Sequence, residues 1–474
     1  MGIALNVPQE VIEALEARTF SLHIKGSAGT GKTTMALELM KLFPEESEAV
    51  YLSTRVSPDR LYEQFPWSKS FIHKENIIDA KSTWYPKTKE ETVFEYVDKP
   101  TFLRSLYSRA LEAEKKRLII IVDSLEALKS NLRIPENDMS VERDILEMAD
   151  RLDANVIFIS ELSGESKLDY LVDGVVRLEK EIVDERLLRK LYIEKVRGTS
   201  IENPMYLFTL RNGRFTCFEK GFQINFTCEE LPKVERKEGR KIPTLVDEID
   251  KILGGGFEKG SFNIFDVEDN VGRGHACILS HTFFGFMRQG FPVFYIPSKG
   301  ITSSDIIGHV PPTFLDDNFL NTLKRYFYVF KPKQHINQPE SRSYNKYTIE
   351  GKDYGEDMRI FRETVSGVLR DVRTDTFVVV MASDTMEYIY GSREIIKIIQ
   401  SYTDEVKQLN GIMIVVQFGH ESFKLPSHLA ASHFRIVNIA GNIIFYGEVP
   451  RTKMYVATLN ISGKHIRPNL IPIE

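Results

Sequence analysis

Short apolar runs alternate with amphipathic segments along the first half of the chain. The runs contain few polar residues and lie at 20–26, 49–54, 117–124 and 155–161. Because unbroken apolar residues indicate strands that are buried on both faces, they predict a parallel sheet covered by helices. Helical patterns lie between the runs, at 33–43 and 141–152. The alternation therefore predicts an α/β fold with a mainly parallel central sheet.

Three further strand-like segments follow, and the pattern then restarts. LVDGVVRLEK, RKLYIEKVRGT and MYLFTLRNGRFTCF are expected to be antiparallel strands that complete the first sheet. Four more buried strands are expected in the second half, at 261–267, 291–298, 376–383 and 411–419. Because the second half repeats the order of the first, the simplest interpretation is two tandem copies of one α/β domain.

Two polar stretches interrupt this repeat. Residues 231–243 have a proline near each end and more basic than acidic side chains. We interpret them as an exposed linker between a first domain, 1–230, and a second domain, 244–474, because a solvated charge run is commoner than a DNA contact. Residues 331–358 are expected to form a long mobile insertion in the second copy.

The composition is that of a globular protein from a reducing compartment. Of 474 residues, 42% are hydrophobic and 27% are charged, and the formal net charge is −5. This mixture supports a sizeable core and disfavours nucleic acid as a partner. Three cysteines without a C-x-x-C pattern predict neither a disulfide framework nor a zinc site. No apolar run approaches the roughly 20 residues of a membrane helix, and no signal-peptide pattern begins the chain, so we expect a cytoplasmic protein.

A glycine-rich loop follows the first expected strand. Its sequence, GSAGTGKT at 26–33, matches the phosphate-binding pattern G-x-x-x-x-G-K-[ST] in full. Glycines let the backbone approach phosphate oxygens, and successive N–H groups with the following helix N-terminus favour an anion. The residues expected to bind ATP are Gly26, Ser27, Ala28, Gly29, Thr30, Gly31, Lys32, Thr33 and Thr34. Lys32 is expected to reach the β- and γ-phosphates and to act in catalysis.

A metal site is expected beside this loop. The apolar run at 118–122 ends in Asp123, and a carboxylate at the tip of a buried strand can orient the water shell of Mg²⁺. The hydroxyl of Thr33 is expected to be the other metal ligand. Alternatively, Asp123 caps the next helix. No N-K-x-D base-reading motif is present, which favours ATP over GTP.

These motifs resemble the RecA-like P-loop ATPases, and specifically their KaiC-like branch. The resemblance is carried by GSAGTGKTT, by IIIVDS, by LVDGVVRLEK followed by KVRGT, and by the second-half entry VDEIDKILGGGFEKGS. It implies two tandem RecA-like domains. The segment at 51–67 resembles the P-loop domain of the archaeal gas-vesicle regulatory D proteins, which implies an archaeal source and a regulatory role.

The resemblance also implies a ring and a role for two cations. In KaiC-like proteins the nucleotide lies between neighbouring subunits, and the K-x-R-G-T segment reaches the phosphates of the adjacent subunit. Lys195 and Arg197 would do so here, and their positive charges would stabilise the transition state. An ordinary salt bridge at a strand end explains the pair equally well.

The usual catalytic glutamate is missing from its expected position. RecA-like enzymes place it just after the second strand, but residues 53–58 contain no carboxylate, and Arg55 cannot serve as a base. Glu126 and Glu161 are possible substitutes. We favour a surface role for Glu126 and expect Glu161, at the tip of the fifth strand, to sense the γ-phosphate. ATP binding with slow hydrolysis is therefore expected.

The second copy of the loop has lost its phosphate-binding chemistry. In DNVGRGHA, at 269–276, His275 replaces the lysine and Ala276 replaces the hydroxyl that would hold Mg²⁺. Ala382 stands where Asp123 does, and Asp384 comes two residues late. We therefore expect a degenerate pseudo-ATPase domain with a scaffold or interface role.

Three functions remain open at this stage. A regulatory ATP switch acting through a protein partner or a homo-oligomer is favoured, because a slow site holds its ATP state. A DNA repair or recombination ATPase of the RecA-paralogue type is the alternative, although no basic, aromatic-interleaved DNA loop is evident. A KaiC-like autokinase or a small-molecule kinase is the third, since a P-loop does not name its acceptor.

Overall fold

The structure, a computed structural model, divides into two compact units. Ala4–Lys220 with Ile473–Glu474 form the first unit, and Gly221–Pro472 form the second. The residues described are 6–16, 19–42, 47–54, 56–79, 99–112, 117–221, 224–226, 239–301, 317–333, 344–419, 423–462 and 465–474. The expected domain boundaries at 230 and 243 stay predictions, because most of the intervening segment lies outside these residues.

The first unit is built around a nine-stranded sheet in the order β3-β2-β4-β5-β1-β6-β7-β8-β9. Neighbours from β3 to β6 are parallel, and the chain then turns back so that β6 to β9 pair antiparallel. The strands are β1 (Ser21–Lys25), β2 (Ser47–Ser53), β3 (Ile77–Asp79), β4 (Arg117–Asp123), β5 (Asn155–Ser160), β6 (Gly174–Val183), β7 (Arg186–Val196), β8 (Met205–Thr209) and β9 (Thr216–Phe218). The antiparallel finish of the first sheet lies where the sequence predicts it.

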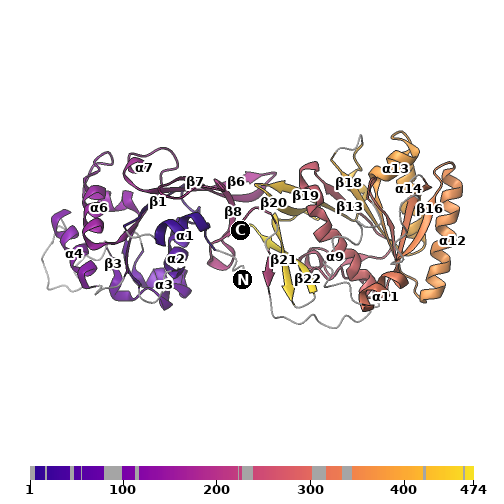
Figure 1. Ribbon diagram of the computed structural model, residues 1–474, viewed down its shortest axis with the longest axis horizontal. Coiled ribbons are helices and arrows are strands. Elements are labelled where there is room, and N and C mark those ends of the chain that lie inside the picture. The colour runs from indigo at the N-terminus through magenta and orange to yellow at the C-terminus, as the bar shows by residue number, and fades with distance from the viewer. Residues whose placement is uncertain are drawn as a thin grey trace. The chain divides into compact units, whose positions relative to one another are not determined.

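Helices cover both faces of this sheet (Figure 1). They are α1 (Gln9–Glu16), α2 (Lys32–Leu42), α3 (Pro58–Gln64), α4 (Lys99–Glu112), α5 (Leu125–Asn131), α6 (Ser140–Leu152) and α7 (Leu168–Leu171). Alternate residues of β4 point to opposite faces: Ile119 and Ile121 pack with α1 and α2, whereas Ile120 and Val122 pack with α4 to α6. Two cores explain why the strand sequences are apolar without interruption.

The second unit contains a second mainly parallel sheet, in the order β10-β21-β20-β19-β13-β18-β17-β14-β15-β16, with β22 beside β21. Its strands are β10 (Ile224–Phe226), β13 (Phe262–Val267), β14 (Val293–Ile296), β15 (Phe327–Pro332), β16 (Asn345–Ile349), β17 (Val378–Ala382), β18 (Ile412–Phe418), β19 (Ser432–Ile439), β20 (Asn442–Val449), β21 (Tyr455–Ser462) and β22 (His465–Pro472). The central order β19-β13-β18-β17-β14 matches β6-β1-β5-β4-β2 of the first sheet. The two units therefore share one topology at their centres.

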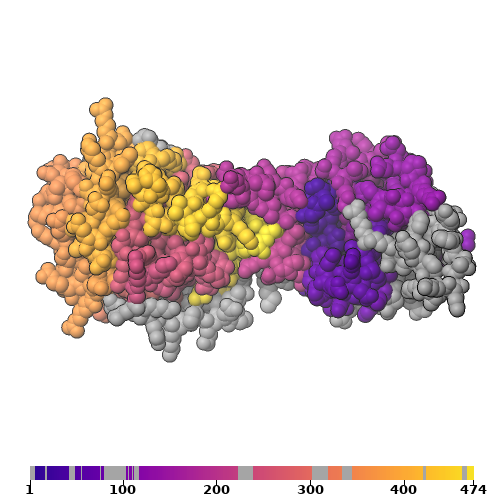
Figure 2. Space-filling view, turned by 180° about the vertical axis from the view of Figure 1, so that it is seen from behind, coloured from indigo at the N-terminus to yellow at the C-terminus, as the bar shows by residue number. Residues whose placement is uncertain are grey.

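Helices again lie on both faces of the second sheet. They are α8 (Asp247–Ile252), α9 (His275–Arg288), α11 (Asp317–Tyr326), α12 (Tyr354–Val372), α13 (Ser383–Tyr390) and α14 (Ile395–Gln408). The first three pack on one core and the last three on another; the surface of the latter layer is the orange region of Figure 2. In the part of the chain that the structure describes, no helix is long and apolar enough to cross a membrane.

One expectation from the polar stretches is corrected, and the linker at 231–243 stays a prediction. Residues 331–358 are not one long insertion, because β16 pairs in parallel with β15 and α12 begins at Tyr354. The buried side chain of Ile349 and the ring of Tyr347 stacked on Phe330 supply the apolar contacts that the polar composition conceals. Within 231–243, Lys241–Ile242 form β11, which pairs with β12 (Phe257–Glu258).

Candidate nucleotide-binding site

The glycine-rich loop connects β1 to α2 at the carboxyl ends of the parallel strands. Gly26 has a φ of 149°, and a Cβ there would come within 2.3 Å of the carbonyl oxygen of Leu178. Gly31 has a φ of 102°, and a Cβ there would come within 2.8 Å of the side chain of Leu210. A larger residue at either position would displace the loop, so these glycines are required by close packing as well as by their backbone angles.

Lys32 is the first residue of α2, and its side chain returns over the loop. Its Nζ donates hydrogen bonds to the carbonyl oxygens of Gly26, at 2.7 Å, and Ser27, at 2.9 Å. The loop tip at 27–29 is exposed, whereas the Lys32 side chain is buried. The loop therefore presents its tip to solvent with a positive charge and a helix N-terminus behind it, an arrangement that favours an anion.

Thr33 and Asp123 meet at the edge of this loop. Thr33 Oγ1 donates to Asp123 Oδ2 at 2.7 Å, and the hydroxyl of Tyr51, on the neighbouring β2, donates to the same oxygen at 2.6 Å. The fully buried Tyr51 has a pKa well above its usual value, because of desolvation and the nearby carboxylate. A hydroxyl and a carboxylate are the oxygen donors that Mg²⁺ prefers, so the residues present fit the expected metal.

The glycine-rich loop borders a cavity with a volume of about 390 Å³. Glu161 lines this cavity together with Lys32, Thr33, Asp123 and Ser124. The backbone N–H of Glu161 donates to Glu126 Oε1 at 3.0 Å. The expected surface role of Glu126 is therefore corrected: its side chain is half-buried and holds the start of the loop that follows β5. Its Oε2 is buried and, among the residues described, has no hydrogen-bond partner.

Lys195 and Arg197 are not brought to the loop of their own unit. By strand register Lys195 is level with His23, three residues before the loop begins. Its Nζ donates to the carbonyl oxygens of Asp169 and Val172, and burial followed by the charge of Arg197 lowers its pKa. Arg197 is 59% exposed and pairs with Asp173 at 3.1 Å. Any contact of this pair with a nucleotide would therefore involve another site.

Two other cations, which the sequence motifs did not indicate, contact the loop from the β6–β7 hairpin. Lys180 and Arg189 face each other in the antiparallel register. Lys180 Nζ donates to the carbonyl oxygen of Ala28 at 3.1 Å, and Arg189 Nη1 donates to that of Gly29 at 3.3 Å. Burial lowers the pKa of Arg189. Only the pairing of β6 with β1 places these residues, so no local sequence signal could have identified them.

A buried polar network lies beneath the loop. His23 Nδ1 is 2.7 Å from Asp169 Oδ1, and its Nε2 is 2.6 Å from Ser160 Oγ. Lys25 Nζ pairs with Asp169 Oδ2 at 2.8 Å and with Glu194 at 2.7 Å. Burial opposes ionisation of Asp169, but the hydrogen bonds from His23 and Lys25 outweigh it and hold the pKa well below its usual range. Ser160 is 1% exposed, so this serine–histidine–aspartate arrangement ties β1, β5 and α7 together rather than attacking a substrate.

The part of the chain that carries the glycine-rich loop, Thr33 and Asp123 matches a known family model. Residues 16–194 match the family model for the GvpD gas vesicle protein, P-loop domain. Protein GvpD1 of Halobacterium salinarum is 23% identical to this chain in an alignment that covers 92% of the chain and 90% of GvpD1.

Two further relatives match a smaller share of the chain. The circadian clock oscillator protein KaiC of a Picosynechococcus species is 25% identical over 56% of this chain and 51% of KaiC. A UPF0273 protein of Thermotoga maritima is 26% identical over 42% of the chain and 85% of its own length. The expected resemblance to GvpD and to KaiC-like P-loop ATPases is confirmed, and so is the fold of two tandem RecA-like α/β domains.

The similarity to GvpD1 extends through the second unit, where the corresponding loop differs in chemistry. The 3₁₀ segment η5 (Asp269–Gly274) replaces the phosphate loop before α9, and His275 Nδ1 lies 2.7 Å from the carbonyl oxygen of Gly272. Asp384 does not take the place of Asp123, because it lies in α13 and accepts hydrogen bonds from Ser298 Oγ, at 2.5 Å, and from the backbone of Lys299. Burial raises the pKa of Asp384.

Proposed function

We propose that the first domain binds ATP with Mg²⁺ and acts as a slow, regulatory ATPase. The observation that carries this proposal is the hydrogen bond between Thr33 and Asp123, which sets the two expected Mg²⁺ partners beside the glycine-rich loop. Mg²⁺ would neutralise charge on the β- and γ-phosphates when it is bound. Lys32 would move from the loop carbonyls to the phosphates, and the backbone N–H groups at 27–31 would orient them.

Slow hydrolysis is supported by the two hydroxyl side chains at the end of β2, Ser53 and Thr54. Ser53 Oγ donates to the carbonyl oxygen of Val56, and Thr54 Oγ1 donates to that of Asp123 at 3.0 Å. These groups are engaged by the backbone and are not bases at neutral pH. Arg55 lies outside the described residues. Glu161 is then the carboxylate in the cavity best placed to orient an attacking water, with Glu126 positioning its backbone.

A switch that works through protein partners follows from the same features. A site that binds ATP well and hydrolyses it slowly remains in its ATP state long enough for a partner to recognise that state. The similarity to a gas vesicle protein and to a clock oscillator protein supports a regulatory class of function. We propose a homo-oligomer in which Lys195 and Arg197 serve the nucleotide of the neighbouring subunit, since they are distant from their own loop.

Native mass spectrometry of the full chain, with and without ATP and Mg²⁺, tests the proposal. We expect one ATP per chain, nucleotide-dependent assembly, and loss of both in Lys32→Ala. His275→Ala is the matched control at the corresponding position of the second domain, and it should bind one ATP as the wild type does. Two nucleotides per chain, or equal loss in both variants, would contradict the proposed single working site.

A further inference from the structure

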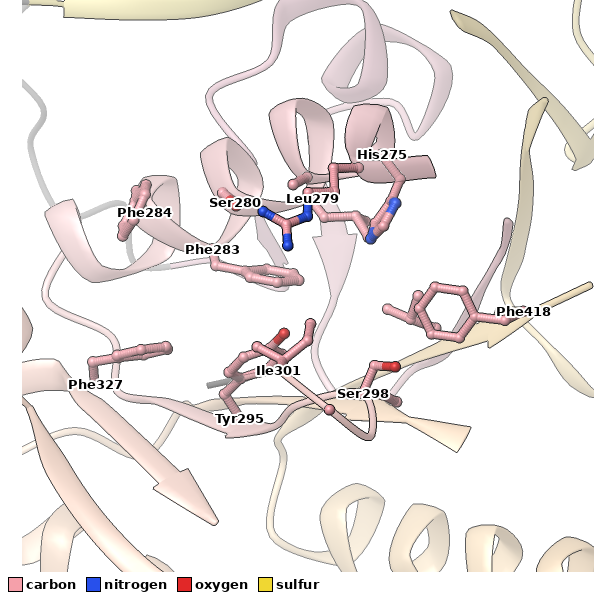
Figure 3. Close-up of a pocket in the computed structure, with 15 residues that line it drawn as sticks. His275, Leu279, Ser280, Phe283, Phe284, Tyr295, Ser298, Ile301, Phe327 and Phe418 are labelled. Carbon is pink, nitrogen blue, oxygen red and sulfur yellow. The ribbon is translucent and has the colours of Figure 1, made fainter. Parts of the chain in front are cut away.

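The second unit has a cavity at the position that the nucleotide site occupies in the first. It lies between the start of α9 and the ends of β14, β17 and β18, and has a volume of about 190 Å³ (Figure 3). Most of its lining is apolar or aromatic, including Phe283, Tyr295, Phe327 and Phe418. The cavity therefore lies at the equivalent place in the fold, but its side chains differ from those of the first site.

Strand registers identify what has replaced each polar group. Asp123 pairs with Ile159, two residues before Glu161, and Ala382 pairs with Val416, two residues before Phe418. Ala382 thus takes the position of the metal-binding aspartate and Phe418 that of the glutamate. On the helix that follows the loop, Ala276 takes the position of Thr33. All three polar groups of the first site have apolar counterparts in the second.

Both units have a tyrosine at the same strand position, and its surroundings differ between them. Tyr51 pairs with Ile121 in β4, and Tyr295 pairs with Val380 in β17, so both lie two residues before the strand-end position. Tyr51 donates to Asp123, whereas the ring of Tyr295 packs against Phe283, at 5.9 Å between centroids, and stacks on Phe327, at 5.8 Å. An aromatic wall has replaced a hydrogen bond to a carboxylate.

The volume and the aromatic walls of the cavity suit a small aromatic group. Figure 3 shows Phe283, Tyr295 and Phe327 on one side of it and His275 with Phe418 at the other end. The rings of His275 and Phe418 meet edge to face at 5.6 Å. An apolar cavity of about 150 Å³ holds benzene in an engineered protein. One six-membered ring with a short substituent therefore fits here, whereas ATP needs the polar groups that this site has lost.

The charges at the cavity favour a single negative group on that ligand. None of the described residues that line the cavity is a carboxylate, whereas Arg273, on the exposed η5 segment, is a permanent cation and His275 is a second basic side chain. Ser280 supplies a hydroxyl between the apolar walls, whereas the hydroxyl of Ser298 is engaged in its hydrogen bond to Asp384. A ligand with an aromatic ring and a carboxylate would match both halves of the lining.

We propose that the second domain binds a small aromatic carboxylate in this cavity. The ring would lie among Phe283, Tyr295 and Phe327, and the carboxylate would face Arg273. The proposal is independent of ATP binding in the first domain, because it rests on the residues of the second unit alone.

Calorimetric titration of the full chain with phenylacetate, and separately with the uncharged 2-phenylethanol, tests the proposal. We expect saturable binding of phenylacetate. Ser280→Phe, which fills the cavity, should weaken that binding at least about tenfold, and a thermal unfolding curve would show that the variant is folded. Arg273→Gln should weaken phenylacetate binding by about tenfold and leave 2-phenylethanol unchanged. The matched control is Arg288→Gln, at the last residue of α9 and not part of the cavity lining, which should bind both probes as the wild type does.

Four outcomes would overturn the proposal, the last of them through the charge of the ligand. One is that phenylacetate does not bind saturably. Another is that Ser280→Phe, although folded, binds it as the wild type does. The third is that ATP displaces phenylacetate from the Lys32→Ala protein, since that result would make the cavity a retained nucleotide site. Equal effects of Arg273→Gln on both probes would overturn the assignment of a charged ligand.

Discussion

The hydroxyl of Thr33 donates a hydrogen bond of 2.7 Å to Oδ2 of Asp123, although the two residues are 90 positions apart in the chain. The bond joins the first turn of α2 to the end of β4. The same carboxylate oxygen accepts a bond from Tyr51, so it is held from two sides. If these oxygens hold Mg²⁺ as proposed, they are largely in place before the ion binds, which lowers the cost of ordering them.

Replacing Thr33 with valine should remove the dependence of ATP affinity on Mg²⁺. Valine keeps the shape of the side chain but lacks the hydroxyl, and hydrogen bonds to charged groups contribute about 1.5–3 kcal/mol, so a loss of about tenfold or more is expected with Mg²⁺ present. Titration with a fluorescent ATP analogue, with Mg²⁺ and with a chelator, measures both affinities. Wild-type Mg²⁺ dependence in Thr33→Val would exclude Thr33 as a metal partner.

Replacing Glu161 with glutamine should slow hydrolysis without weakening ATP binding. A positioned general base contributes about 10²–10⁴-fold, so the single-turnover rate should fall by at least about tenfold. Glu126→Gln should lower the same rate less, because its carboxylate acts through the backbone of Glu161. Glu165→Gln, an exposed residue of the same loop, is the control. Unchanged turnover in Glu161→Gln would show that hydrolysis, where it occurs, uses another base.

Mixing two inactive variants should restore activity if neighbouring subunits share a site. Glu161→Gln is expected to keep ATP binding and assembly but to lose most of the hydrolysis, and Arg197→Ala removes the cation proposed to act on the next subunit. In a randomly mixed ring with heterologous interfaces, about a quarter of the interfaces combine an intact glutamate with an intact arginine. Steady-state ATPase activity of the mixture should therefore reach about a quarter of the wild-type value. A mixture no more active than its components would place Arg197 outside the site.

Acid should destabilise the wild-type protein more than an Asp169→Asn variant. The folded pKa of Asp169 lies well below the value of about 3.9 expected in the unfolded chain, so its contribution to stability is present above that value. As the pH falls below about 4, the unfolded chain takes up a proton that the folded protein does not, and the contribution is lost. Urea unfolding between neutral pH and pH 3 measures the difference.

The control for this measurement is Asp150→Asn, on the exposed side of α6. This variant should keep the wild-type dependence of the free energy of unfolding on pH. Asp169→Asn should be less stable at neutral pH and should show a flatter acid limb. A parallel acid limb in Asp169→Asn and in the wild type would contradict the proposed role of the His23–Asp169–Lys25 network.

The sequence predicts the fold well where the signal is continuous. The strand at 117–123 is apolar throughout because both of its faces are buried, and it forms β4 as expected. The segment at 345–349 is the counterexample. Its polar composition conceals one buried residue, Ile349, and one stacked ring, Tyr347, which suffice for a strand at the edge of a sheet. Composition therefore fails where few apolar contacts determine the structure.

Some residues of the candidate site can also be predicted from the sequence, and others cannot. The glycine-rich loop is contiguous, so its pattern alone identifies it, and Asp123 and Glu161 follow from the rule that parallel strands end at one edge. Lys180 and Arg189 could not be found, because their contacts depend on the register of β6 against β1. The role of Glu126 was missed for a similar reason, since its partner is a backbone N–H on another element.

The placement of two cations on β7 bears on cooperativity between subunits. Near one end the strand carries Arg189, which contacts the loop of its own unit, and at the other end it carries Lys195, which we propose serves the neighbouring subunit's nucleotide. The strand pairs with β6 from Arg186 to Val196, with one register shift beside Val175, the partner of Lys195. In a ring of the proposed kind, filling one site would therefore alter the affinity of the next, and ATP saturation would follow a curve with a Hill coefficient different from one.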